Sequence, residues 1–163
     1  MTKFLLAVHV IAAILAIGPV AVAASMFPPA ARRAFVTATG AGTGASADAG
    51  ASDGPDAAGT LHLLHRICRV YAVVGVVVPV FGFATASRLG VLGSAWLIVS
   101  IALTALAALV LAALVLPAQS VLLDGAGTRR TTARLGMYTG LFNLLWAAVT
   151  VLMIVRPGST TGA

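Results

Sequence analysis

Four long apolar segments constrain this chain more than any other feature of its sequence. They cover Phe4–Met26, Val70–Ala86, Leu92–Leu116 and Leu135–Val155, and none of them contains Asp, Glu, Lys or Arg. About 20 apolar residues of α-helix cross the hydrocarbon core of a bilayer. The second segment is shorter, and we expect it to continue a helix that starts near Thr60. Because backbone polar groups in lipid must bond within their own segment, α-helices are expected for all four.

The sequence therefore predicts an all-α fold, a polytopic membrane protein whose four transmembrane helices form one bundle and one domain. The expected helices cover about 4–27, 61–87, 92–116 and 133–155. Residues 37–59 are almost entirely Ala, Gly, Ser, Thr and Asp, which predicts a flexible cytoplasmic loop. Residues 158–163 are small and polar and are expected to form a disordered tail. A hydrophobic content of 60% with 9% charged residues lies far outside the soluble range.

Prolines and threonines predict where these helices bend or end. The first helix is expected to end near Phe27-Pro28-Pro29, and Pro117 is expected to end the third. Pro79 is expected to kink the second helix. Thr131 or Thr132 can cap the fourth helix.

The basic residues lie at the ends of the predicted helices, which indicates an orientation and a partner. The formal net charge is +6. One side of the bundle would carry Lys3, Arg88 and Arg156, and the other Arg32, Arg33, Arg66, Arg69, Arg129, Arg130 and Arg134. The positive-inside rule then predicts that the seven arginines are cytoplasmic and that both termini are outside. Anionic lipid headgroups are the expected partner. Nucleic acid is rejected because no soluble face interleaves basic and aromatic residues.

The strongest cluster of polar side chains is predicted at the cytoplasmic end of the second helix. His62, His65, Arg66 and Arg69 follow one another at i, i+3, i+4 and i+7, which places them on one helical face. This face can be a basic surface in contact with anionic lipid. It can also be an anion or cofactor site, where His65 ligates haem iron and Arg66 and Arg69 hold the propionates.

His9 is the second candidate, because an ionisable residue inside a membrane span is a functional hypothesis by default. It can hydrogen-bond a neighbouring helix, or it can ligate haem b together with Met153, which is expected at the same depth. His9 and His65 are expected at opposite ends of the bundle, so one haem cannot join them. No nucleophile–base pair predicts a catalytic residue, and no third ligand near His62 and His65 completes a zinc site. Cys68 is interpreted as structural.

Small residues predict the faces on which the helices pack. Gly136, Gly140 and Asn143 share one side of the fourth helix, and the two glycines form a G-x-x-x-G step. Gly75 and Gly82 belong to a similar stripe on the second helix. Small residues let helices approach closely in lipid, where no hydrophobic effect drives them together. Packing within the chain is favoured over dimerisation, and Asn143 is expected to hydrogen-bond another helix.

The first helix reads A-V-H-V-I-A-A-I-L-A-I-G-P-V, with His9 nine residues before Gly18, and it resembles the CopD-like superfamily of four-helix bacterial membrane proteins. That group includes the HemJ-type protoporphyrinogen oxidases. The stretches L-H-R-I-C-R-V-Y and L-P-A-Q are similar to an uncharacterised integral membrane family of this kind. The resemblance implies a haem-linked role for His9. The oxidase activity is not carried over, because the first helix lacks the tryptophan of those enzymes and the only lysine is Lys3.

These observations favour a bacterial inner-membrane protein without catalytic activity, a structural or accessory subunit that packs against a membrane-protein partner or a second copy. A haem b-binding redox or tetrapyrrole-handling protein is the first alternative. A small-solute or metal permease is the second, and it rests on the resemblance alone.

Overall fold

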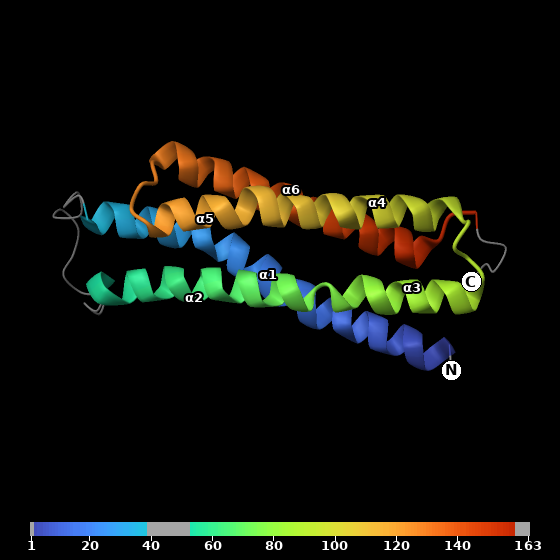
Figure 1. Ribbon diagram of the computed structural model, residues 1–163. Helices are drawn as coiled ribbons and strands as arrows, with labels where there is room; N and C mark the ends of the chain where they lie inside the picture. The colour runs from blue at the N-terminus through green and yellow to red at the C-terminus, as the bar shows by residue number, and fades with distance from the viewer. Residues whose placement is uncertain (1, 39–52, 159–163) are drawn as a thin grey trace.

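The computed structural model describes residues 2–38 and 53–158, and this part of the chain is a bundle of four antiparallel helical spans (Figure 1). The helices are α1 (Thr2–Ala38), α2 (Asp53–Val74), α3 (Val77–Leu89), α4 (Ala95–Val110), the π-helical turn η1 (Leu111–Val115), α5 (Leu116–Leu123) and α6 (Arg129–Val155). Four candidate membrane spans result, namely Lys3–Val36, Ala58–Leu89, Ala95–Leu123 and Arg129–Val155. The prediction of an all-α, four-helix membrane bundle is confirmed.

Contacts of α1 and α6 with the other helices hold the four spans together. α1 packs against α2, α3 and α6, α4 packs against α6, and α5 packs against α2 (Figure 1). With 37 residues, α1 is about 55 Å long, whereas the hydrocarbon core is about 30 Å thick. α1 crosses the other helices diagonally (Figure 1), and such a tilt takes up only part of the excess length, so the ends of α1 extend beyond the hydrocarbon core.

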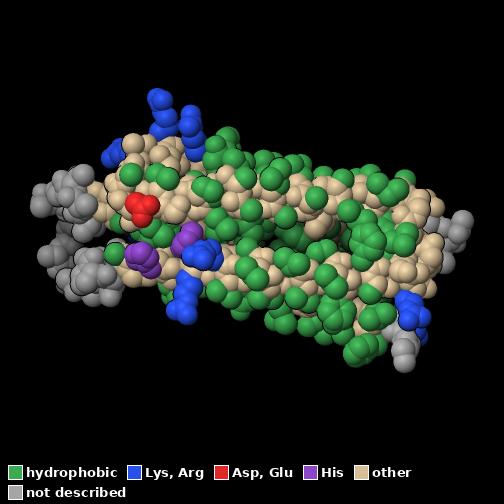
Figure 2. Space-filling model, viewed as in Figure 1, with side chains coloured by type: hydrophobic (Ala, Val, Ile, Leu, Met, Phe, Trp, Pro, Cys, Tyr) green, Lys and Arg blue, Asp and Glu red, His purple; other side chains and the backbone are tan. Residues whose placement is uncertain are grey.

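The main core lies where α1, α2, η1, α5 and α6 meet. Phe27, Cys68, Val115 and Leu135 are fully buried there. A smaller cluster closes the other end, where Trp96 packs with its neighbours Ala86, Leu97, Val91 and Met153. The outer surface is covered with exposed large hydrophobic side chains, as Figure 2 shows, which is the arrangement expected of a surface that faces lipid.

The expected end of the first helix at Phe27-Pro28-Pro29 is wrong, because α1 continues to Ala38. The two prolines lack the N–H groups that would bond the carbonyls of Ala24 and Ser25. Packing holds the helix together across this gap, since Phe27 and Ala31 are both buried in the main core. The C-terminal boundary of the loop predicted over 37–59 is also wrong, because α2 already starts at Asp53. Residues 39–52 of that loop, and 159–163 of the predicted tail, lie outside the described residues.

The second span is interrupted between α2 and α3, one turn before Pro79, where the kink was predicted. Pro79 cannot donate to the carbonyl of Gly75, four residues earlier. This carbonyl instead accepts a hydrogen bond from the N–H of Val78, at 3.2 Å. The shorter turn separates the two helices without ending the span.

The third helix does not end at Pro117 as expected, because α5 continues to Leu123. The π-helical turn η1 stands directly before the proline, and the N–H of Leu116 donates to the carbonyl of Leu111, five residues back. This wider turn accommodates the proline within the helix. The fourth helix likewise begins earlier than predicted, because Thr128 is the cap residue and forms a capping box with Thr131.

Candidate functional site

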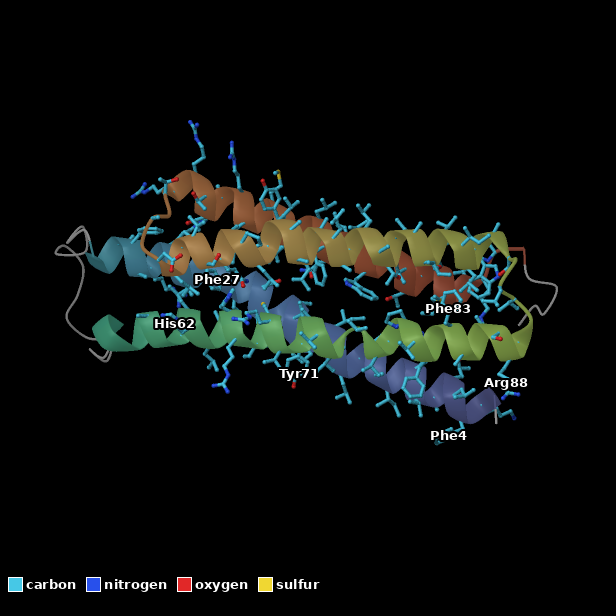
Figure 3. All side chains as sticks on the ribbon, viewed as in Figure 1. Phe4, Phe27, His62, Tyr71, Phe83 and Arg88 are labelled. Atoms are coloured by element: carbon cyan, nitrogen blue, oxygen red, sulfur yellow. The ribbon has the colours of Figure 1, made fainter. Side chains whose placement is uncertain are left out.

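An open groove of about 550 Å³ runs along one face of α2. We call it the basic groove, and its lining consists of His62, His65, Arg66, Arg69, Val70 and Val73. These residues follow one helical stripe, as the spacing of the first four predicted, so the polar end of the groove continues into an apolar end. Figure 2 shows the histidines and arginines gathered on this part of α2, and Figure 3 labels His62 on the ribbon.

Gln119 of α5 holds His65 at the inner wall of the groove. The Gln119 side chain is fully buried, and its Oε1 lies 3.0 Å from Nδ1 of His65. Its Nε2 donates to the sulfur of Cys68, at 3.6 Å. With the amide in this orientation, His65 carries its hydrogen on Nδ1 and presents a lone pair on Nε2. Gln119 of α5 therefore fixes the imidazole at the groove, and Cys68 of α2 fixes Gln119 in turn.

Gln119 is not recognisable as a site residue from the sequence, because the predicted helix end at Pro117 places it in a loop. Since α5 continues past the proline, Gln119 shares the buried face of that helix with Leu122. The signal that could have indicated this is the spacing of Val115, Gln119 and Leu122 at i, i+4 and i+7. Cys68, which was interpreted as structural, is one of its two partners.

His9 links α1 to α3, beyond the break that separates α2 from α3. Its Nδ1 donates to the carbonyl of Val78, at 2.9 Å. The imidazole lies over Gly82 so closely that a Cβ there would be 2.8 Å from Cε1 and 3.6 Å from Nε2. His9 therefore links two helices through Nδ1 and its contact with Gly82. In both His9 and His65 the hydrogen bond is made by Nδ1, an arrangement that is also common in metal-ligating histidines. The haem-ligand roles of His9 and His65 stay predictions.

The other residues singled out in the sequence fall in different parts of the bundle. Met153 packs against the Trp96 cluster. A Cβ on Gly75 would lie nearest to the carbonyl oxygens of Tyr71 and Ala72, at 3.2 and 3.3 Å. Gly136 and Gly140 have no atom within 4 Å of the position where a Cβ would lie. The structure thus brings Gly82 against another helix and leaves the G-x-x-x-G step of α6 open.

Beside this open step, α6 carries polar atoms in the interior of the bundle. Asn143 donates through Nδ2 to the hydroxyl of Ser25 on α1, at 3.1 Å. Among the residues that the structure describes, no hydrogen-bond partner reaches three buried polar atoms on the same side of α6, namely Oγ1 of Thr139, Oδ1 of Asn143 and Nε1 of Trp146. Among residues 2–38 and 53–158, no three His, Cys, Asp or Glu side chains are close enough to hold a metal ion.

Comparisons with known proteins add no assignment to this geometry. No family model, curated protein or solved structure matches this chain. The resemblance to the CopD-like superfamily therefore stays a prediction, and the candidate site is interpreted from its own residues.

Proposed function

We propose that this protein is a non-catalytic accessory subunit of a bacterial inner membrane, which packs against a partner helix through one face of α6. The observation that supports this proposal is the open space over Gly136 and Gly140. Around the two glycines, the large side chains of Met137, Leu141 and Leu144 are exposed. The glycines form a shallow surface beside these side chains, and a second helix fits such a surface.

The physical reason lies in how helices associate in lipid. Lipid chains are as apolar as leucine, so two helices associate only when close packing replaces contacts with lipid. A glycine in a helix costs about 1 kcal/mol relative to alanine, and Gly82 offsets this cost by admitting the ring of His9. Within the described residues no such contact offsets the cost at Gly136 and Gly140, so a helix from another chain supplies it.

A photo-crosslinking amino acid placed at position 140 in intact membranes tests this proposal. We expect an adduct from position 140, and we expect the substitution Gly136→Leu to abolish it. The matched control is the same probe at Ala108, which is exposed on α4. The mass of the adduct identifies the partner, and twice the mass of this chain indicates a second copy. Equal adducts from positions 140 and 108 would contradict the proposal.

A second proposal is that the basic groove binds haem b through His65. It is favoured by the lone pair that Gln119 leaves on Nε2 of His65, and Arg66 and Arg69 would hold the propionates. A visible spectrum of the detergent-purified protein, with and without dithionite, tests it. A Soret band that disappears in His65→Ala but persists in His9→Ala supports it, and a featureless spectrum from a haem-replete host refutes it.

The permease hypothesis stays a prediction, which uptake into proteoliposomes would test.

A further inference from the structure

We propose that the basic groove of α2 is a binding site for one anionic phospholipid. The phosphate headgroup lies between Arg66 and Arg69, and the first part of an acyl chain lies along Val70 and Val73. This site is separate from the α6 face and does not depend on it, and a phospholipid in the groove excludes the haem of the second proposal.

The groove carries positively charged side chains, so the ligand expected there is an anion. Arg66 and Arg69 are exposed, and within the described part of the chain they make no ion pair. His62 adds a third nitrogen-bearing side chain to the same wall, whereas His65 already donates through Nδ1 to Gln119. Guanidinium groups bind phosphate oxygens in pairs, with good geometry and with charge assistance. A phosphate is therefore the ligand that matches the donors at this end of the groove.

The depth of the groove matches the headgroup region of a bilayer. The span Ala58–Leu89 has 32 residues, or about 48 Å of helix, against a hydrocarbon core of about 30 Å. If this excess is shared equally, about 9 Å of helix projects at each end, which places His62 among the headgroups. Arg69 lies just inside the hydrocarbon boundary, from where its long side chain reaches back to the phosphates.

The apolar end of the groove favours a lipid over a soluble phosphate. Val70 is 50% exposed and Val73 is 74% exposed, and both lie further into the span than the arginines. The volume of about 550 Å³ lies within the range of sites for whole small molecules. A headgroup with the start of its chain uses both ends of the groove, whereas a free phosphate uses only the basic end.

The groove also has a preformed wall, which distinguishes it from an ordinary basic surface. Gln119 is fully buried and hydrogen-bonds both His65 and Cys68. This network holds the imidazole in place before a ligand arrives, which lowers the entropy cost of binding. Arg129 and Arg130 of α6 are equally basic and exposed, but they do not line the groove. They provide a matched control.

Native mass spectrometry of the full chain, released from vesicles of phosphatidylcholine with and without phosphatidylglycerol, tests the proposal. We expect one retained phosphatidylglycerol per chain. Arg66→Gln/Arg69→Gln should weaken retention about thirty-fold, since each arginine near an anionic membrane surface contributes on the order of fivefold. Arg129→Gln/Arg130→Gln, which removes the same charge, should leave retention unchanged. If the glutamine pair fails to fold, Arg66→Lys/Arg69→Lys replaces it as the test; this pair keeps the charge but loses the paired guanidinium donors, so it should retain less lipid than the unchanged protein.

Several outcomes would overturn the proposal. Equal losses in the two glutamine pairs would show binding to general surface charge. Displacement of the lipid by millimolar inorganic phosphate would assign the site to a soluble anion. A haem lost on His65→Ala would show that the groove holds a tetrapyrrole. Gly136→Leu should not change lipid retention, so failure of the α6 proposal and failure of this one are distinguishable.

Discussion

Gly82→Ala is the substitution whose effect follows most directly from this structure. The added Cβ would lie 2.8 Å from Cε1 and 3.2 Å from Nδ1 of His9, whereas carbon atoms in contact are about 3.5–4.0 Å apart. The imidazole must therefore retreat by roughly 1 Å. Its bond to the carbonyl of Val78, now 2.9 Å, then lengthens beyond the limit of a hydrogen bond.

The magnitude follows from three contributions to the free energy of unfolding. Overpacking costs about 1–3 kcal/mol, and the lower end applies because a side chain faces the new methyl group and can swing aside. The lost hydrogen bond between helices costs about 0.6 kcal/mol. Alanine returns about 1 kcal/mol through its helix propensity. We therefore expect Gly82→Ala to destabilise the protein by about 0.6–1 kcal/mol.

Unfolding in mixed micelles at rising dodecyl sulfate fraction, followed by far-ultraviolet circular dichroism, measures this free energy. Gly140→Ala is the matched control, because nothing lies within 4 Å of its new Cβ. It should stabilise the monomeric protein by up to about 1 kcal/mol. In a His9→Ala background the contact is gone, so Gly82→Ala should also become stabilising. The double-mutant cycle should then show a coupling of about 1.6–2 kcal/mol between positions 9 and 82. An equal effect of Gly82→Ala in both backgrounds would refute the reasoning.

Three further predictions use the same unfolding measurement. Thr128→Ala removes the capping box of α6 and should cost about 1 kcal/mol; no change would show that the first turn of α6 does not contribute. Gln119→Leu leaves Nδ1 of His65 without its partner and should cost about 1–3 kcal/mol. Adding His65→Leu should recover most of that loss, and a purely additive double variant would contradict the pairing. Arg156→Gln removes the guanidinium that lies 5.8 Å from the ring centre of Trp96 and whose Nε donates to the carbonyl of Met153. The ring contact should contribute about 0.5–1 kcal/mol, so the cost of Arg156→Gln should be smaller by that amount in a Trp96→Leu background, and an equal cost in both backgrounds would contradict the contact.

The number and position of the membrane spans could be predicted from the sequence because they depend on local composition. Transfer of an apolar helix into lipid is a sum over its own residues, so Leu92–Leu116 and Leu135–Val155 were recognisable without knowledge of any neighbour. The same holds for the stripe from His62 to Arg69, because the helical period alone places these side chains on one face.

The helix ends at prolines could not be predicted in this way. A proline removes one hydrogen bond, and whether the helix ends there depends on what else holds the chain. At Pro28 the burial of Phe27 against neighbouring helices carries α1 onward. At Pro117 a π-helical turn absorbs the change. Both outcomes depend on contacts with distant segments, and a local pattern contains no information about them.

The sequence by itself determined the class of this protein, its four spans and the basic stripe of α2, since each depends on hydrophobicity or period within one segment. Only the tertiary structure decided the partners of the polar groups inside the bundle. Gln119 hydrogen-bonds His65, which lies 54 positions earlier in the chain, and Gly82 packs against the ring of His9, which lies 73 positions earlier. Such pairings are set by the relative rotation and tilt of packed helices. In lipid these depend on close packing between specific side chains.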